Sequence, residues 1–408
     1  FMASAVLEEG VATLDTKYIC NGYINVDKYR MNCHYHAGHG TQTLTQGLEN
    51  SCNPFFITLG QRLGVHNYFK YFDGFGFTQK TGIDLPGEAS PQYYEEKQYG
   101  IVELSSASFG QTNSLTPIQV CTGLCAIANG GKLMKPYVVS EMKDQDGNTV
   151  SKAEPTTIRQ VISEDTSKKV CQMMQSVVDN GTGKNAYVAG YKVGGKTGTS
   201  TKLGESKEGE KNKYIVSFAA IAPADDPEIA MIIICDEPNV DLGGGAICAP
   251  VAATVIKESK AVLGVEPSYT EEEKKTLSVK APNVIAKSVS DAEAAIKSAG
   301  LDCKVVGTGD KITSQSPAAG NTVPSGGQVV LYTSGAEKET VTVPDFAGLT
   351  VSQANSLAAS SGLNIEISGN ASSDALVVAY KQSEDQGKEV DAGTVITVSF
   401  KSTKAVLD

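Results

Sequence analysis

The sequence predicts a multidomain α/β (α+β) protein, and three observations support this fold class. The chain has 408 residues, which is too long for one ordinary core, so two or three domains are expected. Residues 1–264 contain a mixture of strand-like and helix-like apolar patterns. After residue 277 the chain repeats itself at an interval of about 62 residues, which indicates two copies of a small module.

The composition excludes several classes of protein. With 40% hydrophobic and 20% charged residues the chain is neither disordered nor collagen-like. Its net charge is −11, and only Arg30, Arg62 and Arg159 among its 35 cationic residues are arginines. Guanidinium clusters that read phosphates or base edges are therefore missing, and nucleic acid is not an expected partner. No run approaches the roughly 20 apolar residues of a membrane span.

The first element is expected to be a helix over residues 2–9. The stretch is apolar and Ala-rich, and Gly10 follows it, which is typical of a helix that ends at a glycine. Because the helical pattern is already under way at Phe1, we expect the chain to be a fragment whose natural start lies upstream.

Residues 1–264 are expected to carry the chemistry, since they hold all four His and eight of the nine Cys. Residues 265–277 are polar and charged without an apolar period, which predicts a linker. Two repeats follow at 278–336 and 340–402. Each repeat has a Pro-led turn, a helix and short strands, so each is predicted to be a small αβββ module.

Within the repeats, Ala-rich helices are predicted at 290–298 and 352–360, and β-branched strands at 329–332 and 395–398. This pattern resembles the PASTA repeat, an extracellular module of some penicillin-binding proteins and of certain bacterial serine/threonine kinases. The resemblance implies binding of muropeptides or of division proteins.

Two short motifs in residues 1–264 point to acyl-transfer chemistry. One is a Ser-x-Asn triplet formed by Ser51 and Asn53, and the other is Gly-Gly-Lys-Thr-Gly-Thr at 194–199. Each is weak alone, because Ser, Asn, Thr and Gly are common in turns. Together they have the general type found in β-lactamases and penicillin-binding proteins.

With their surroundings, these motifs resemble the transpeptidase domain of a class B penicillin-binding protein. The similar stretches include 38–56, 108–119 and 244–250, in the order of the family. The resemblance implies a penicilloyl-serine transferase-like fold with a central antiparallel sheet flanked by helices. It also implies a division or sporulation protein on the extracellular face of a Gram-positive cytoplasmic membrane, with a membrane anchor upstream of this chain.

The resemblance assigns catalytic roles to Ser51, Asn53 and Lys196, and substrate binding to Thr197, Gly198 and Thr199. Ser51 would relay a proton toward the leaving group, and Asn53 would hold a catalytic lysine and the substrate amide. The threonine hydroxyls would bind the terminal carboxylate of a D-Ala-D-Ala stem peptide or of a β-lactam. Gly198 would let the substrate backbone lie against its strand, where a side chain would block the approach.

The nucleophile of this family lies in a Ser-x-x-Lys motif that precedes Ser-x-Asn. The only such motif in this sequence joins Ser140 to Lys143. It follows Ser51 along the chain and runs into a hairpin signal at 144–149, so we reject it. We expect the nucleophile just upstream of Phe1, and the assigned function then belongs to the parent protein.

Four potential soft ligands fall within 33 residues: Cys20, Cys33, His39 and Cys52. Three thiols and one imidazole suit tetrahedral Zn²⁺, although His34 and His36 compete for the fourth position. A Cys20–Cys33 disulfide and free buried thiols are the alternatives. If zinc binds, Cys52 would connect the metal to the Ser-x-Asn motif, so that the site would be structural with catalytic consequences.

The favoured function is that of a peptidoglycan D,D-transpeptidase, which cross-links stem peptides through a serine acyl-enzyme and binds β-lactams. The alternative is a non-catalytic muropeptide-binding or scaffold protein of the cell-wall machinery. A secreted β-lactamase is disfavoured, because such enzymes do not normally carry two repeats of this kind. The segment upstream of Phe1 distinguishes the first two hypotheses.

Overall fold

The computed structural model describes residues 1–202, 213–240, 242–263, 269–270, 273, 278–369 and 377–402. The chain divides into two compact units, Phe1–Val188 with Lys192–Ser259 and Ala189–Tyr191 with Lys260–Asp408. The linker expected at 265–277 lies outside the described residues, apart from 269–270 and 273. Within the described ranges, every helix is too short or too polar to span a bilayer.

Helices enclose most of the apolar core of the first unit, which includes Phe55, Leu59, Leu104 and Met173, all at most 2% exposed. The first helix ends before Gly10, whose φ is +65°, as the sequence predicts. The helices are α1 (Met2–Glu8), α2 (Leu44–Glu49), α3 (Asn53–Gly74), α4 (Ile101–Ser108), α5 (Pro117–Ala128), α6 (Glu164–Asp179) and α7 (Gly244–Leu263), with 3₁₀ helices η1 (Glu96–Gln98) and η2 (Lys184–Ala186).

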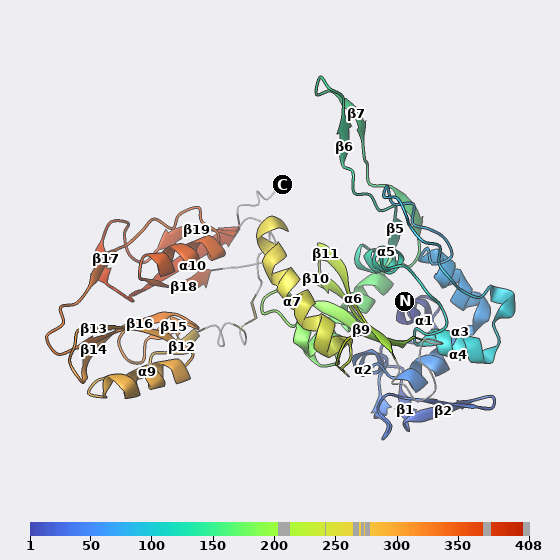
Figure 1. Ribbon diagram of the computed structural model, residues 1–408, viewed down its shortest axis with the longest axis horizontal. Coiled ribbons are helices and arrows are strands. Elements are labelled where there is room, and N and C mark those ends of the chain that lie inside the picture. The colour runs from blue at the N-terminus through green and yellow to red at the C-terminus, as the bar shows by residue number, and fades with distance from the viewer. Residues whose placement is uncertain are drawn as a thin grey trace. The chain divides into compact units, whose positions relative to one another are not determined.

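The sheet of this unit consists of β9 (Gly194–Thr201), β10 (Tyr214–Ala222) and β11 (Ile229–Asp236), all antiparallel, with β10 in the centre. Figure 1 shows α7 on one face of the sheet and α5 and α6 on the other. The predicted antiparallel sheet with flanking helices is therefore confirmed. The Lys-Thr-Gly motif lies on β9, and within the described part of the chain β10 is the one strand paired with it.

Four short strands precede the Ser-x-Asn motif. β1 (Tyr18–Cys20) pairs with β4 (Gly40–Gln42), and β2 (Tyr23–Val26) pairs with β3 (Tyr29–Asn32). β4 leads directly into α2, whose N-cap Thr43 forms a capping box with Gln46. The cysteine-rich segment thus runs through these strands and α2 and ends at the turn between α2 and α3.

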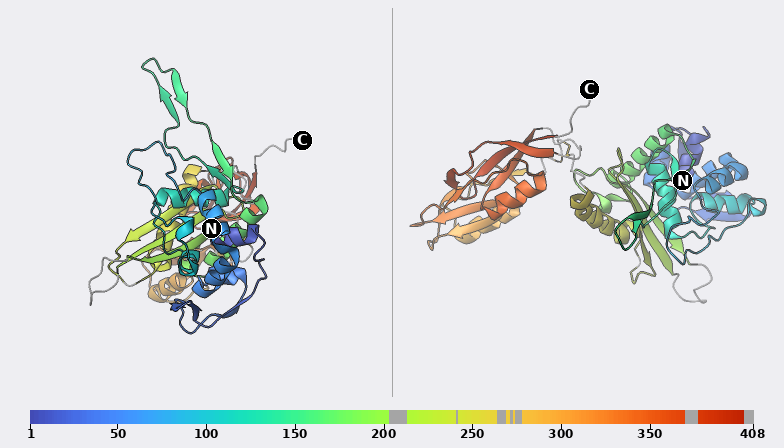
Figure 2. Two further views of the ribbon diagram at one scale, coloured as in Figure 1. Left: turned by 90° about the vertical axis from the view of Figure 1, so that its right-hand side faces the viewer. Right: turned by 90° about the horizontal axis from the view of Figure 1, so that it is seen from above.

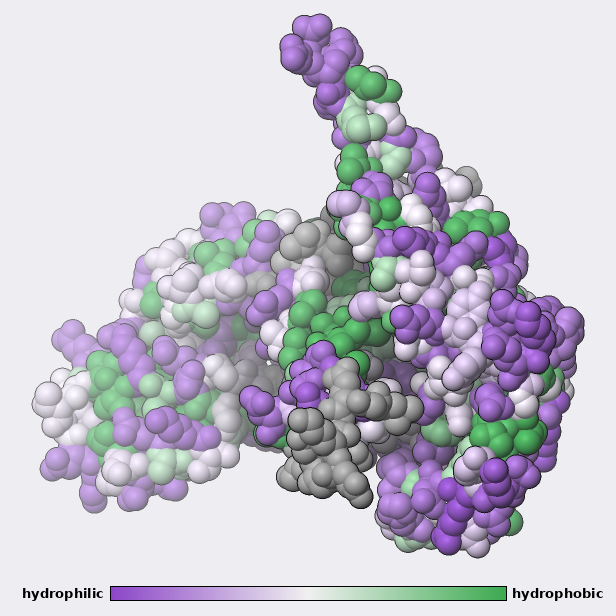
Figure 3. All heavy atoms as spheres, turned by 45° about the vertical axis from the view of Figure 1, so that its right-hand side comes forward, coloured by the Kyte–Doolittle hydropathy of each residue, from purple (hydrophilic) through white to green (hydrophobic). Residues whose placement is uncertain are grey.

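A β-hairpin arm projects from the first unit (Figures 1 and 3). Its base is β5 (Lys132–Met134) with β8 (Thr157–Gln160), and its outer part is β6 (Glu141–Lys143) with β7 (Thr149–Lys152). Figure 3 shows a hydrophilic tip and hydrophobic side chains nearer the base. The rejected Ser-x-x-Lys motif runs into β6, where all three residues are exposed, as the hairpin signal predicts.

The carboxylate of Asp84 anchors this arm. It accepts hydrogen bonds from the backbone N–H groups of Val138 and Val139, at 2.8 and 2.9 Å. These two bonds lower the pKa of Asp84. The Gly-Ile-Asp-Leu-Pro-Gly stretch at 82–87 thus has a structural role outside the sheet.

The second unit contains two modules of the same topology (Figure 2). In each, a long strand pairs in parallel with one neighbour and antiparallel with the other. The helices and strands predicted from the repeat are confirmed. The first module has β12 (Ser278–Lys280), α9 (Val289–Ser298), β13 (Asp302–Val306), β14 (Ile312–Ser316), β15 (Thr322–Pro324) and β16 (Gln328–Thr333); the second has β17 (Thr340–Thr342), α10 (Val351–Ser360), β18 (Asn364–Gly369), β19 (Val377–Gln382), β20 (Glu389–Asp391) and β21 (Val395–Ser402).

A buried asparagine joins the two modules. Asn364 is 5% exposed. Its side-chain Nδ2 donates to the carbonyl oxygens of Gln328 and Gly393, at 2.9 and 2.7 Å. Its Oδ1 accepts from the N–H of Gln328 at 2.9 Å. Val330 and Tyr332 of β16 pack with Ala392 of the second module. The modules therefore share an interface with both polar and apolar contacts.

Candidate functional site

The Ser-x-Asn motif begins at the C-terminal end of α2. The N–H of Ser51 donates to the Leu48 carbonyl at 3.1 Å, and the N–H of Cys52 donates to the Gly47 carbonyl at 2.9 Å. These two bonds form a Schellman motif, in which Ser51 occupies the position usually taken by glycine. Its φ is +50°, which is a left-handed conformation that costs energy in a residue with a side chain. Such strain is characteristic of functional positions.

This conformation brings the Ser51 hydroxyl to Lys196, although 145 residues separate the two along the chain. Lys196 Nζ donates to Ser51 Oγ at 2.9 Å. It also lies 2.8 Å from the Thr197 carbonyl oxygen and 3.3 Å from Thr197 Oγ1. Burial in the cavity wall lowers the pKa of Lys196 from 10.5 to about 8. The ammonium is thus held by oxygen atoms alone, and its charge is sensitive to pH near neutrality.

Ser51 and Lys196 line a cavity of about 980 Å³ in the first unit. Thr197, Gly198 and Thr199 of β9 also line it, together with Asn53 at the start of α3. Among the described residues of its wall there is no aspartate or glutamate, although the whole chain is acidic. A wall with lysine ammonium groups and hydroxyl groups but without carboxylates favours an anionic ligand.

The remaining residues of the two motifs lie as follows. Asn53 Nδ2 donates to the Asn32 carbonyl at 3.1 Å, which ties the start of α3 to β3. A Cβ on Gly198 would lie 2.4 Å from the Ser217 hydroxyl on β10, so a side chain at this position would displace that hydroxyl. Thr199 is exposed on the cavity side of β9.

One further hydroxyl at the cavity comes from outside both motifs. Thr182 Oγ1 lies 3.1 Å from Thr197 Oγ1 and lines the same cavity. The sequence alone assigns no role to Thr182 or to the Asn-Gly-Thr-Gly stretch at 180–183. Its signal was the pair of glycines around a threonine, which is also the signal of an ordinary turn.

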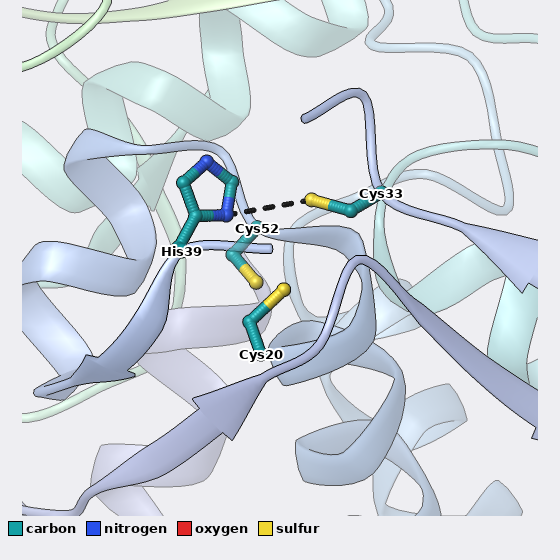
Figure 4. A group of neighbouring side chains, drawn as sticks. All are labelled: Cys20, Cys33, His39 and Cys52. Atoms are coloured by element: carbon teal, nitrogen blue, oxygen red, sulfur yellow. Dashed lines mark hydrogen bonds between the residues drawn. The ribbon is translucent and has the colours of Figure 1, made fainter. Parts of the chain in front are cut away.

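The structure brings Cys20, Cys33, His39 and Cys52 together, and Figure 4 shows their side chains directed to a common centre. One donor atom from each lies within 4.8 Å of the others. Cys33 Sγ lies 3.5 Å from His39 Nδ1 and 4.0 Å from His34 Nδ1. All nine cysteines of the chain are free thiols in the structure, so the Cys20–Cys33 disulfide is not formed.

The environment of this Cys/His cluster favours one thiolate. A hydrogen bond from the Cys52 thiol lowers the pKa of Cys33, and the same bond together with burial raises the pKa of Cys52. The two sulfur atoms thus share one proton. Thiolates are the form in which cysteine binds metals, and no charged carboxylate is part of the group. Cys52 is also the N-cap of α3, between Ser51 and Asn53.

Comparison with known proteins gives a family for each unit. Residues 1–257 match the penicillin binding protein transpeptidase domain, and residues 279–335 and 341–402 match the PASTA domain. The first match covers well over half of the 408 residues and includes both motifs.

Individual relatives agree with these matches. Stage V sporulation protein D of Bacillus subtilis is 42% identical over 338 residues, which cover 81% of this chain and 52% of that protein. Penicillin binding protein 3 of Mycobacterium tuberculosis, solved in complex with aztreonam, is 29% identical with a TM-score of 0.60, over 66% of this chain and 62% of that one. Penicillin binding protein 2X of Streptococcus thermophilus shares the fold over 98% of this chain and 60% of its own, with a TM-score of 0.58 and 23% identity. The chain spans about half the length of the curated relative from B. subtilis.

Proposed function

Since the chain belongs to the penicillin-binding protein transpeptidase family and carries PASTA domains, we propose that its parent protein is a peptidoglycan D,D-transpeptidase of the division or sporulation type. It would cross-link stem peptides that end in D-Ala-D-Ala through a serine acyl-enzyme, and β-lactams would acylate the same serine. Two similar proteins support this choice: the sporulation protein of Bacillus subtilis, and the penicillin binding protein that was solved in complex with aztreonam.

The observation that carries the proposal is the contact between Lys196 and Ser51 inside the cavity without carboxylates. A transpeptidase must bind a peptide carboxylate next to the bond that it cleaves, and it must also move a proton to the leaving amine. Lys196 would provide the positive charge for the carboxylate. Ser51, which accepts a hydrogen bond from Lys196, would relay the proton.

We also propose that a Ser-x-x-Lys segment upstream of Phe1 supplies the nucleophile. The one such motif in the sequence lies at β6, in the projecting arm, and none of its residues lines the cavity. Asn53 and the backbone N–H of Thr199 would then face the acyl group, the latter as part of an oxyanion hole.

Intact mass spectrometry with a labelled penicillin tests this proposal. The 408-residue chain and a version extended by its upstream coding sequence are compared before and after incubation, and the adduct is mapped by peptide analysis. An adduct on a serine upstream of Phe1, in the extended version only, is the expected result. Absence of an adduct from both versions would instead favour the muropeptide-binding or scaffold protein.

The proposed setting is the extracellular face of the cytoplasmic membrane of a Gram-positive bacterium, with an anchor in the upstream part. The PASTA modules would bind muropeptides or division proteins there. A parent protein recovered from the cytoplasmic fraction would contradict this localisation.

We further propose that the Cys/His cluster, formed by Cys20, Cys33, His39 and Cys52, holds one structural Zn²⁺. Zinc–sulfur bonds of about 2.3 Å in a tetrahedron place the sulfur atoms about 3.8 Å apart, and the donor atoms here all lie within 4.8 Å of one another. Only a small contraction is therefore needed. The metal would fix Cys52, and through it the turn that carries Ser51 and Asn53.

A further inference from the structure

The hydroxyl of Thr182 lies at the cavity wall in direct contact with a side chain of the Lys-Thr-Gly motif, and it has no role in the proposal above. Its Oγ1 lies 3.1 Å from Thr197 Oγ1. We propose that Thr182 is a specificity-determining residue, which donates a hydrogen bond to the same substrate carboxylate as Thr197. This inference rests on the proposed function and adds a binding residue to it.

Backbone contacts from one side fix the position of Thr182. Its N–H donates to the Glu49 carbonyl of α2 at 3.0 Å, and the N–H of Gly183 donates to the Val177 carbonyl of α6 at 3.0 Å. A Cβ on Gly181 would lie 2.6 Å from the Glu49 carbonyl oxygen, so this turn lies against the end of α2 as closely as a glycine allows. The turn that presents Thr182 is thus bonded to Glu49, the last residue of α2, which lies two residues before Ser51.

The start of α7 fixes Thr182 from the other side. A Cβ on Gly245 would lie 2.4 Å from the Thr182 carbonyl oxygen and 3.1 Å from Thr197 Cγ2. Gly245 therefore packs against both threonines at once. Because neither neighbour leaves room for a shift of the turn, the fold holds the backbone of Thr182 beside Thr197, where the two hydroxyls can lie 3.1 Å apart.

Two hydroxyls at this separation suit a carboxylate. Without a ligand, one hydroxyl donates to the other, and this bond joins two neutral groups. A carboxylate has only acceptors, so both hydroxyls can turn toward it, and hydrogen bonds to an ionised group are roughly twice as strong as neutral ones. A C-terminal amide instead presents an NH₂ donor, for which the described wall offers no Asp or Glu as acceptor. The pair of threonines thus favours a carboxylate over its neutral counterpart.

The test compares two ligands that differ only at this end: an N-acyl-D-Ala-D-Ala dipeptide and its C-terminal amide. Their affinities for the 408-residue chain are measured by ligand-observed NMR at pH 7. The variants are Thr182→Val, which replaces the hydroxyl by a methyl group, and Thr182→Ser, which keeps it. Thr254→Val is the control, because the Thr254 hydroxyl bonds to the Pro250 carbonyl of α7 and lies outside the cavity wall.

We expect the wild-type chain to prefer the carboxylate, and Thr182→Val to reduce this preference about tenfold while affinity for the amide stays the same. Thr182→Ser and Thr254→Val should keep the wild-type preference. Thermal unfolding checks that the variants fold, and Thr182→Ala provides the same comparison if the valine variant does not.

Three results would overturn the inference. If Thr182→Val keeps the wild-type preference, Thr182 does not bind the carboxylate. If the variant loses affinity for both ligands equally, the role of Thr182 is purely structural. The proposed function survives either result. A wild-type chain that binds both ligands equally would overturn this inference and the carboxylate site of the proposed function together.

Discussion

The left-handed conformation of Ser51 leads to a prediction that stability measurements can test. Ser51→Gly and Ser51→Ala both remove the hydroxyl that Lys196 contacts at 2.9 Å, while Lys196 keeps its two contacts to Thr197. The two variants therefore lose the same hydrogen bond. They differ in the Cβ: alanine has one and is strained at a φ near +50°, whereas glycine has none and adopts this φ without steric cost.

The expected difference follows from two opposing terms. A left-handed residue with a Cβ costs roughly 1–2 kcal/mol, whereas glycine loses roughly 0.5–1 kcal/mol more in backbone entropy on folding. The free energy of unfolding of Ser51→Gly should thus be about 0.5–1 kcal/mol larger than that of Ser51→Ala. For a unit of this size, that corresponds to a Tm about 2 °C higher for the glycine variant.

Differential scanning calorimetry of the two variants, side by side, measures this difference. Both should be less stable than the wild type, since a hydrogen bond to a charged group is worth about 1.5–3 kcal/mol. An alanine variant as stable as the glycine variant, or more stable, would show that the turn carries no strain and would refute the argument that Ser51 is held in place by its surroundings.

Three further predictions follow from the same structure. The preference of the chain for a carboxylate ligand should weaken as pH rises through about 8, because Lys196 loses its charge there. NMR titrations between pH 6.5 and 9.5 measure this change, and Lys196→Met should show no such pH dependence. The purified chain should contain one zinc per molecule by elemental analysis, and Cys33→Ser should lose it while Cys171→Ser, a buried cysteine outside the cluster, keeps it. Asn364→Ala should lower the free energy of unfolding of the PASTA unit by about 1–3 kcal/mol, because the Gln328 backbone N–H and carbonyl lose their partner. A chemical denaturation curve unchanged from wild type would contradict this prediction.

The repeats could be predicted because their signals are local. The Ala-rich stretches at 290–298 and 352–360 are preceded by Ser288 and Thr350, which are the observed N-caps of α9 and α10. The interface between the modules could not be predicted in this way. It depends on Asn364, a single polar residue at the start of a strand, and nothing in its neighbourhood distinguishes it from a surface asparagine.

The Cys/His cluster and the contact between Ser51 and Lys196 also differ in how local their sequence signals are. The cysteines and His39 lie within 33 residues, so their spacing alone suggested a metal site, and the structure brings them together. The contact of Ser51 with Lys196 spans 145 residues. It arises because α2 packs against α6 and α6 packs against β9, so only the family resemblance pointed to it. Thr182 was missed because its position depends on close contacts with Glu49 and Gly245, which are distant in sequence and leave no local sequence pattern.

The central claim is that Lys196 belongs to an acyl-transfer site, and the rate of penicillin acylation tests it most directly. The chain extended by its upstream sequence is compared with its Lys196→Met variant at pH 7, with Lys213→Met as a control, since Lys213 pairs with Glu237 on the surface. We predict a loss of roughly 100-fold or more in the second-order rate for Lys196→Met and wild-type rates for the control. Equal rates for all three proteins would contradict the account.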